Sequence, residues 1–187
     1  MKEHISATPT LMLIGGAPGS GKSTLASTLA AERPLALALD IDTIKHSLGT
    51  WERDPTAAGL QARRLAVAMI DRHLTDGYDV VLGQYLARTA FLEELESLAA
   101  ARRARFIEAV LVLDESTLAR RLAGRRERPD RPEHTVNDRF VGPADAGDLV
   151  RSIDQVLALR PGAHRVDACG SPEETAAVLR RLLTGVS

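Results

Sequence analysis

Apolar residues along the chain fall into short runs that alternate with longer segments of helical periodicity. The short runs are typical of strands buried in a parallel sheet, and they predict strands at 11–14, 35–39, 80–82, 106–113 and 164–166. Apolar residues spaced by three or four predict helices at 24–31, 55–76, 91–103, 116–126, 149–159 and 172–183. Strands that alternate with helices indicate right-handed βαβ units, and therefore a parallel sheet with helices on both faces.

The residue pattern also supports the longest predicted helix and indicates which strand is central. Leu60, Arg64, Val67 and Ile70 fall at helical spacings within 55–76, and Gly77 ends this segment as a helix-terminating residue should. The strand at 106–113 is apolar almost throughout, which predicts a central place in the sheet.

Between the first strand and the first helix lies a glycine-rich segment that fits the phosphate-binding pattern G-x-x-x-x-G-K-[ST]. Its glycines lack a Cβ, so the backbone can adopt left-handed conformations and approach a ligand closely. Backbone N–H groups then converge on phosphate oxygens at the start of the helix, where the helix dipole favours negative charge. Lys22 is expected to reach the β- and γ-phosphates, and the Ser23 hydroxyl is expected to bind Mg²⁺. The predicted nucleotide-binding residues are Gly16, Ala17, Pro18, Gly19, Ser20, Gly21, Lys22, Ser23 and Thr24.

This motif occurs in the context it requires, with an apolar strand before it and a helix after it. The chain is therefore expected to bind a nucleoside triphosphate. The sequence contains no Asn-Lys-x-Asp motif of the kind that reads guanine in GTPases, and the choice between ATP and GTP stays open.

The amino-acid composition disfavours some classes of binding partner. The 187 residues are typical of one domain, and 24 Lys and Arg nearly balance 25 Asp and Glu, which gives a net charge of −1. This balance disfavours a general nucleic-acid or membrane-surface binder, and the 3% of aromatic residues disfavours a stacking platform for single strands. The single Cys169 cannot form an internal disulfide. With no signal-peptide core or membrane-spanning run, we expect a cytoplasmic protein.

Two aspartates, Asp40 and Asp42, follow the second predicted strand, and Lys45 comes soon after them. Ligands of parallel sheets bind at the carboxyl ends of the strands, so these side chains are candidates for chemistry. We assign Asp40 to Mg²⁺ binding with Ser23, and Asp42 to accepting a proton from an acceptor hydroxyl. The alternative for Asp42 is the N-cap of the following helix. Lys45 is either a contact to a polar or anionic part of the acceptor or a solvated helix lysine.

Six arginines lie in the segment 118–132. Arg121 and Arg125 stand four residues apart on a predicted helix and therefore project from one face, whereas Arg128 lies in a proline-containing turn that suits a lid. Guanidinium groups pair with phosphate oxygens and stack on bases. We assign Arg121 and Arg125 to catalysis and nucleotide binding, and Arg128 to the acceptor. A solvated helix face and a nucleic-acid patch are the alternatives.

The phosphate loop, the Asp-x-Asp after the second strand, and Arg-Leu-Ala-Gly-Arg-Arg before an Arg- and Pro-rich segment together resemble the small P-loop kinases. This group includes adenylate, gluconate, shikimate and adenylylsulfate kinases, zeta toxins, and the chloramphenicol and tunicamycin resistance proteins. The resemblance covers nearly the whole chain. It implies a three-layer α/β/α P-loop NTPase fold with a five-stranded parallel sheet in a single domain, 1–187. It also implies a helical acceptor-binding cap at about 43–76, an Arg-rich lid at about 124–140, and a loop at 166–172 that flanks adenine.

The sequence departs from these kinases at the end of the third strand, where many relatives carry an acidic residue and this chain has Gln84 and Tyr85. Glutamine has no charge and cannot act as a base, which leaves Asp40 as the carboxylate for Mg²⁺. We interpret Gln84 and Tyr85 as contacts to the acceptor, together with Arg64 of the cap; a packed Tyr85 is an equal alternative. No arginine pattern of adenylate, shikimate or gluconate recognition is present, so the acceptor's identity stays open.

The sequence therefore predicts an ATP- and Mg²⁺-dependent kinase. We expect it to phosphorylate a hydroxyl of a small molecule, such as an antibiotic, a sugar, a nucleoside or a nucleotide sugar, as a monomer or homodimer. One alternative is a regulatory P-loop ATPase or nucleotide switch that acts on a protein partner. The other is a polynucleotide 5′-hydroxyl kinase, which the near-neutral charge disfavours.

Overall fold

The computed structural model describes residues 8–85, 89–127 and 141–185. Arg128 and most of the predicted lid lie outside the described residues. Five strands form one sheet in the order β2-β3-β1-β4-β5, and every neighbouring pair is parallel. The strands are β1 (Thr10–Gly16), β2 (Leu37–Leu39), β3 (Val80–Gly83), β4 (Arg105–Val112) and β5 (His164–Asp167).

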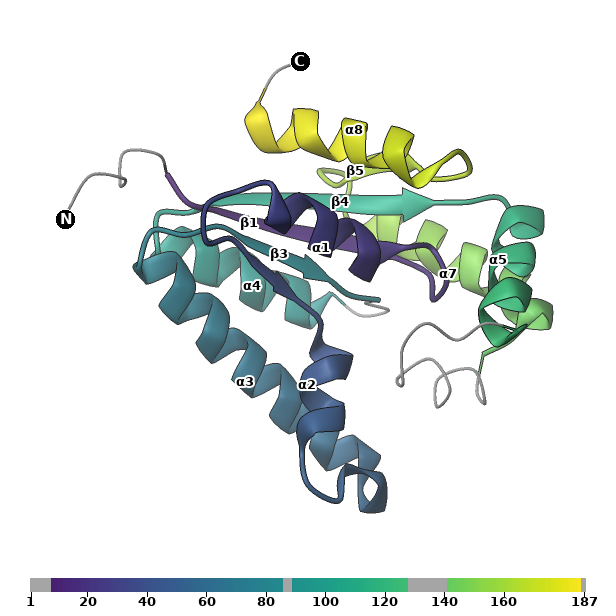
Figure 1. The fold of residues 1–187 in the computed structure, drawn as a ribbon, viewed down its shortest axis with the longest axis horizontal. Coiled ribbons are helices and arrows are strands. Elements are labelled where there is room, and N and C mark those ends of the chain that lie inside the picture. Colours follow the sequence, from purple (N-terminus) through teal and green to yellow (C-terminus); the bar gives the residue numbers. More distant parts are fainter. Residues whose placement is uncertain (1–7, 86–88, 128–140, 186–187) are drawn as a thin grey trace.

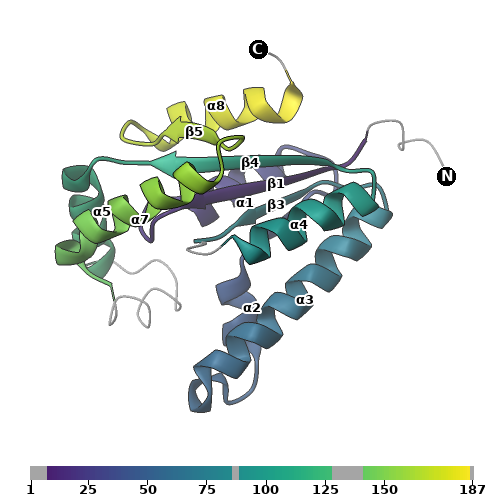
Figure 2. The same cartoon turned by 180° about the vertical axis from the view of Figure 1, so that it is seen from behind.

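Helices cover both faces of this sheet and give three layers (Figure 1 and Figure 2). One face is covered by α1 and α8, and the other by α3, α4 and α7. The helices are α1 (Lys22–Ala31), α2 (Ile41–Ser47), α3 (Pro55–Thr75), α4 (Ala90–Ala101), α5 (Glu115–Glu127), α7 (Ala146–Leu159) and α8 (Pro172–Thr184), with the 3-10 helices η1 (Trp51–Arg53) and η2 (Pro143–Asp145). The predicted three-layer α/β/α fold with a five-stranded parallel sheet is confirmed. Within the described ranges, every helix is too short or too polar to pass through a bilayer.

The middle strand, β1, carries core residues on both of its faces. Met12 and Ile14 pack in the cluster that includes α1 and α8, whereas Leu11 and Leu13 pack in the cluster that includes α3 and α4. Side chains alternate along a strand, so burial on both sides produces the uninterrupted apolar run seen in the sequence. The strand predicted to be central, β4, lies between β1 and β5 and is therefore interior, although β1 holds the middle position.

The predicted start of the second strand is wrong. β2 begins at Leu37 because Leu35 has a left-handed backbone (φ 52°) and is 69% exposed.

On α3 the buried residues are Ala58, Ala62, Ala66, Ile70 and Leu74. Leu60, one of the residues whose spacing predicted this helix, is 52% exposed. Small alanine side chains let α3 pack against α2 and α4. A stripe of alanines lacks the large apolar residues by which a buried helix face is recognised in a sequence.

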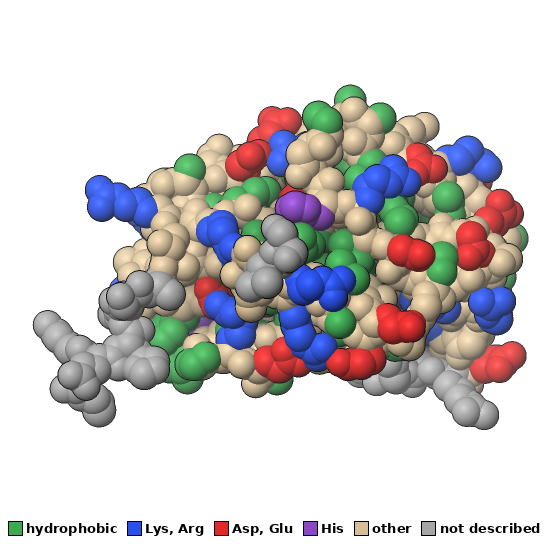
Figure 3. Space-filling view, turned by 90° about the horizontal axis from the view of Figure 1, so that it is seen from above, with side chains coloured by type: hydrophobic (Ala, Val, Ile, Leu, Met, Phe, Trp, Pro, Cys, Tyr) green, Lys and Arg blue, Asp and Glu red, His purple; other side chains and the backbone are tan. Residues whose placement is uncertain are grey.

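The face formed by α8 and α1 carries charges of both signs. Lys and Arg side chains lie among Asp and Glu side chains on this face (Figure 3). Arg180 of α8, for example, forms ion pairs with Glu32 at 2.7 Å and with Glu173 at 2.7 Å. Positive charge here is therefore balanced locally, and exposed pairs of this kind contribute little to stability because solvent screens them.

Candidate functional site

The phosphate loop joins β1 to α1 and has the glycine-dependent backbone that its motif predicts. Gly16, Gly19 and Gly21 have φ angles of 147°, 83° and 96°. A Cβ on Gly16 would lie 2.8 Å from Oγ of Ser20 and 3.2 Å from the carbonyl oxygen of Leu111, so a larger residue would clash. Because α1 begins at Lys22, the N–H groups of its first turn lie next to the loop.

Lys22 is folded back over this loop, and its Nζ donates a 2.8 Å hydrogen bond to the carbonyl oxygen of Ala17. Burial lowers the pKa of Lys22 to about 8; the carboxylates of Asp40 and Asp42 oppose this shift, and the charge of Arg125 adds to it. These residues come from α1, from the junction of β2 with α2, and from α5. The fold therefore brings four of the predicted site residues within electrostatic range of one another.

The carboxylate of Asp40 links the phosphate loop to α2. Its Oδ2 accepts a 2.6 Å hydrogen bond from the hydroxyl of Ser23, and its Oδ1 accepts the backbone N–H of Asp42 at 2.9 Å. The second bond makes Asp40 the N-cap of α2. The alternative in which Asp42 caps this helix is therefore wrong, because Asp42 lies within the first turn.

Asp42 is a half-buried carboxylate on the first turn of α2. Burial raises the pKa of this carboxyl, and the negative charge of Asp40 raises it further. Lys45, His46 and Lys22 act in the opposite direction. A carboxylate with a raised pKa is a better proton acceptor than an ordinary exposed aspartate, which is the property a general base needs.

Arg121 connects the phosphate loop to the segment that follows β5. Its guanidinium group donates to the carbonyl oxygens of Ser20 at 3.2 Å, Ala168 at 2.7 Å and Gly170 at 3.1 Å. Arg125 lies one helical turn further along α5, and its positive charge acts on Lys22. The two arginines predicted to act together therefore lie beside the phosphate loop, and Arg121 holds their helix against the loop 166–172.

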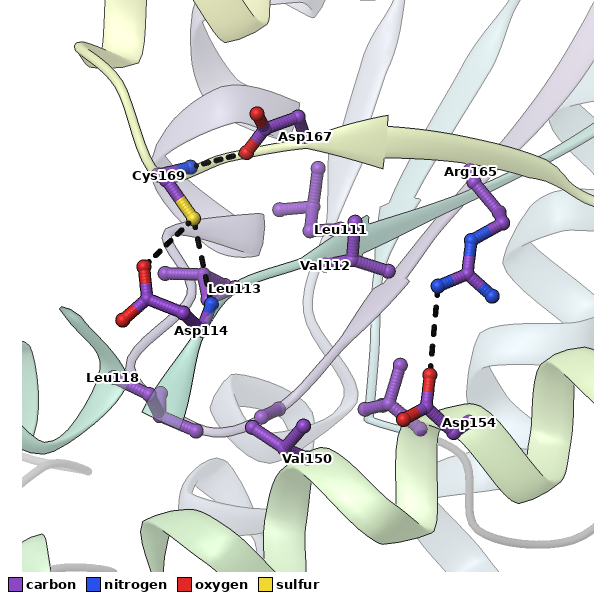
Figure 4. Close-up of a pocket in the computed structure, with 12 residues that line it drawn as sticks. Leu111, Val112, Leu113, Asp114, Leu118, Val150, Asp154, Arg165, Asp167 and Cys169 are labelled. Atoms are coloured by element: carbon purple, nitrogen blue, oxygen red, sulfur yellow. Dashed lines mark hydrogen bonds and ion pairs between the residues drawn. The ribbon is translucent and has the colours of Figure 1, made fainter. Parts of the chain in front are cut away.

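A cavity of about 260 Å³ lies between the ends of β4 and β5 and the helix α7 (Figure 4). Ala17 of the phosphate loop forms part of its wall, together with Asp167 and Cys169 of the segment after β5. Val150 of α7 lines the opposite side (Figure 4). The cavity thus adjoins both the phosphate loop and the loop predicted to flank adenine.

The end of β3 lies directly against the phosphate loop. A Cβ on Gly83 would be 3.0 Å from the carbonyl oxygen of Lys22 and 3.2 Å from the backbone nitrogen of Ser23. This role of Gly83 was not predicted from the sequence, although a glycine that ends an apolar strand is a recognisable sign of close backbone approach. The backbone N–H of Gln84 donates a 3.1 Å hydrogen bond to the carbonyl oxygen of Ile14, so the pairing with β1 continues one residue beyond the end of β3. The hydroxyl of Tyr85 lies 3.0 Å from that of Ser152 on α7, a contact that favours the packed alternative for Tyr85.

Two adjacent arginines of α3, Arg63 and Arg64, differ in their contacts. Arg64, which we predicted to contact the acceptor, is exposed. Its neighbour Arg63 places its guanidinium 5.7 Å from the ring centre of Phe91, at the start of α4. Arg63 is therefore the α3 arginine that approaches the element following the end of β3.

Comparison with known proteins agrees with this architecture. A family model described as AAA domain matches residues 11–140. A gluconokinase from Sinorhizobium meliloti is 17% identical, with a TM-score of 0.57 over 97% of this chain and 100% of that one. Shikimate kinase from Bacteroides thetaiotaomicron is 19% identical, with a TM-score of 0.59 over 95% and 99%. The tunicamycin resistance protein of Deinococcus radiodurans is 15% identical, with a TM-score of 0.58 over 96% and 98%. No curated protein sequence matches.

Proposed function

The chain belongs to the AAA domain family and has the P-loop kinase fold, and we propose that it is a phosphotransferase that moves the γ-phosphate of ATP to a hydroxyl of a small molecule. The observation that carries this proposal is the position of Asp42. It is a half-buried carboxylate within electrostatic range of the phosphate-loop lysine, Lys22. It lies on α2 rather than on the loop itself, so a second substrate can meet it while the nucleotide occupies the loop.

In the proposed reaction the acceptor's hydroxyl oxygen forms a bond to the γ-phosphorus of ATP. The bond from that phosphorus to the oxygen that bridges the β- and γ-phosphates breaks, and ADP leaves with the electron pair. The hydroxyl proton passes to the carboxylate of Asp42. Phosphoryl transfer requires little covalent chemistry from a protein, so positioning and charge neutralisation supply most of the catalysis.

The positive charges around the loop suit that task. Lys22 would turn from the Ala17 carbonyl to the β- and γ-phosphates, because a phosphate oxygen is a stronger acceptor for an ammonium group than a neutral carbonyl is. Arg125 would neutralise charge on the transferring group, since its own charge already reaches Lys22. Arg121 would support the nucleotide through Ser20 and through the loop 166–172, beside which the base would lie.

The residues next to the loop also fit Mg²⁺. Mg²⁺ prefers oxygen ligands and is usually held by one or two protein oxygens together with substrate phosphates and waters. Ser23 and Asp40 present a hydroxyl and a carboxylate that are 2.6 Å apart, and we assign the ion to this pair. A larger cluster of three or more His, Cys, Asp or Glu side chains does not occur in the described part of the chain. When bound, the ion would neutralise negative charge on the phosphates.

The acceptor would lie between α2 and the end of β3, where Lys45 and Gln84 are candidate contacts in addition to Asp42. Arg64 and Tyr85 remain proposed contacts. Arg64 would have to turn from solvent to reach the acceptor, and Tyr85 would have to leave its contact with Ser152. Arg128, outside the described residues, is proposed to reach the acceptor from the lid. Antibiotics, sugars, nucleosides and nucleotide sugars all carry hydroxyls that this chemistry would phosphorylate.

The test measures ATP consumption with Mg²⁺ against a panel of such compounds, with mass spectrometry of the products. We expect one class of compound to gain a phosphate and to raise turnover well above the rate without acceptor. The Asp42→Asn variant should lose transfer but keep ATP binding, because it changes the proton acceptor and leaves the phosphate loop intact. Ser47→Ala, an exposed position on the same helix, is the matched control and should behave as wild type.

Two results would contradict this function. Tight ATP binding without stimulation by any acceptor would favour a regulatory ATPase or nucleotide switch. Equal loss of ATP binding and of transfer in Asp42→Asn would make Asp42 a structural residue rather than a base.

A further inference from the structure

One face of α2 carries three polar side chains that are all half-buried. Asp42, Lys45 and His46 stand at i, i+3 and i+4, and so lie on one side of the helix. Thr43 and Ser47 lie at the flank of this face and are exposed, whereas Ile41 and Ile44 on the far side of α2 pack in the core cluster that includes α3. The charged side chains therefore form a partly enclosed face between the buried side of the helix and its exposed flank. The helix and η1 extend away from the sheet, beyond the end of β2 (Figure 1).

This face looks toward the phosphate loop at one end. The charge of Asp42 acts on Lys22, and the charges of Lys45 and His46 act on Asp42. Along α2, Asp42 is therefore the residue of this face nearest to the phosphate loop, and Lys45 and His46 follow about one helical turn further on. An acceptor with its hydroxyl at Asp42 would place its other end against these two groups.

Trp51 of η1 closes the far end of the face. Its ring centre lies 5.1 Å from Nζ of Lys45 and 4.3 Å from the ring centre of His46, with the two rings inclined by 55°. An ammonium group over an aromatic face is attracted by the ring quadrupole. Lys45 is thus restrained in a half-buried position, and within the residues that the structure describes it forms no ion pair with a carboxylate.

A half-buried ammonium group gains most from an anion as its partner, because burial removes part of its hydration. We propose that the acceptor is an anionic hydroxyl compound, a hydroxy acid or a phosphorylated alcohol, whose negative group binds between Lys45 and His46 while its hydroxyl lies at Asp42. This inference rests on the proposed phosphotransferase function and gives it a substrate class. Amine-bearing acceptors are disfavoured, since their charge would lie against Lys45.

Trp51 is the only tryptophan of the chain, so its fluorescence reports on this end of the site without any need for turnover. Four scaffolds serve as probes: a hexose, a pentose, a cyclic polyol and a nucleoside. Each is titrated in neutral, carboxylated, phosphorylated and aminated form, with ADP present to fill the phosphate loop. The same compounds are assayed for ATP-dependent phosphorylation. The carboxylated and phosphorylated arms distinguish the two kinds of anion.

We expect an anionic form to shift Trp51 emission and to be phosphorylated, with its neutral and aminated counterparts at least about tenfold weaker. Lys45→Gln should raise KM for that compound by about tenfold or more and leave kcat within about threefold. Lys45→Arg keeps the positive charge and should restore most of the affinity, and Ser47→Ala should match wild type. These variants separate the loss of charge from a loss of folding.

Three outcomes would overturn the inference. Neutral or aminated compounds could be phosphorylated as well as anionic ones, the anionic preference could survive in Lys45→Gln, or no anionic compound could change Trp51 emission. The first outcome leaves the phosphotransferase function standing. Conversely, saturable anion binding that depends on Lys45 but gives no phosphorylated product supports this anion site and ends the proposed function.

Discussion

The hydroxyl of Ser23 and Oδ2 of Asp40 are joined by a 2.6 Å hydrogen bond, and the other oxygen of Asp40 holds the backbone N–H of Asp42. One carboxylate therefore links the first turn of α1 to the first turn of α2. The turn of α1 carries residues that we propose to bind phosphate, and the turn of α2 carries those that we propose to meet the acceptor. The distance between the two halves of the site is thus set by short hydrogen bonds rather than by a flexible connection.

Substitutions of Asp40 should separate its two roles. Asp40→Asn retains an oxygen that can cap α2 but loses the carboxylate, so we expect a small change in stability and a higher Mg²⁺ requirement for turnover. Asp40→Ala also loses the cap and should lower the free energy of unfolding by about 0.5–2 kcal/mol. Thermal melts and Mg²⁺ titrations check both effects. An unchanged Mg²⁺ requirement in Asp40→Asn would remove Asp40 from the metal site.

Gly83→Ala should damage the phosphate loop from the neighbouring strand. The new Cβ would lie 3.0 Å from the carbonyl oxygen of Lys22. This oxygen belongs to the backbone of α1 and cannot move freely. We expect a loss of about 1–3 kcal/mol in stability and weaker ATP binding. Gly59→Ala on α3 is the control, because no atom lies within 4 Å of the added Cβ and a helical alanine stabilises by up to about 1 kcal/mol. Equal ATP affinity in both variants would contradict this reading of Gly83.

Sequence patterns with a local cause were predictable, whereas features that depend on contacts between distant elements were not. The phosphate loop and the sheet follow from glycine positions and apolar runs within a few neighbouring residues. The role of Gly83 depends on how closely β3 approaches α1, and the burial of Ala62 depends on α3 meeting α2 and α4. Asp40 and Asp42 were recognised as a pair, but deciding which one caps the helix required the backbone of β2 to end at Leu39.

ATP affinity should depend on pH through Lys22. Burial lowers the pKa of this lysine to about 8 in the free protein, and bound phosphates would raise it again. Binding therefore favours the protonated form. Affinity should be fully present below pH 8 and should fall above it by up to about tenfold per pH unit. Calorimetric titrations between pH 7.5 and 9.5 test this. Lys22→Arg stays charged over that range, so the same loss of affinity in this variant would exclude Lys22 as its cause.

Asp42→Asn should strongly slow transfer and also stabilise the fold. The pKa of Asp42 is raised in the folded state, so its contribution to stability is fully present below the unfolded-state pKa and is lost as pH rises through the folded-state value. At neutral pH the ionised carboxylate therefore costs stability, and a neutral amide should raise Tm while kcat falls by about 10²–10⁴. In wild type the acid limb of kcat/KM should lie above the pKa of an ordinary aspartate. A lower Tm for Asp42→Asn would show that the carboxylate stabilises the fold.

Arg121 should be sensitive even to a conservative change. Its planar guanidinium reaches the carbonyl oxygens of Ser20, Ala168 and Gly170, from two segments far apart in the sequence. A lysine ammonium is a compact donor that cannot span all three, and a carbonyl left without its partner costs about 1–3 kcal/mol. We therefore expect Arg121→Lys to lower both Tm and ATP affinity, and Arg121→Ala to lower them further. Arg120→Ala is the matched control, because among the residues that the structure describes Arg120 bonds only within α5, to the hydroxyl of Thr117 at 3.1 Å. If Arg121→Lys bound ATP as tightly as this control, Arg121 would not couple the phosphate loop to the loop after β5.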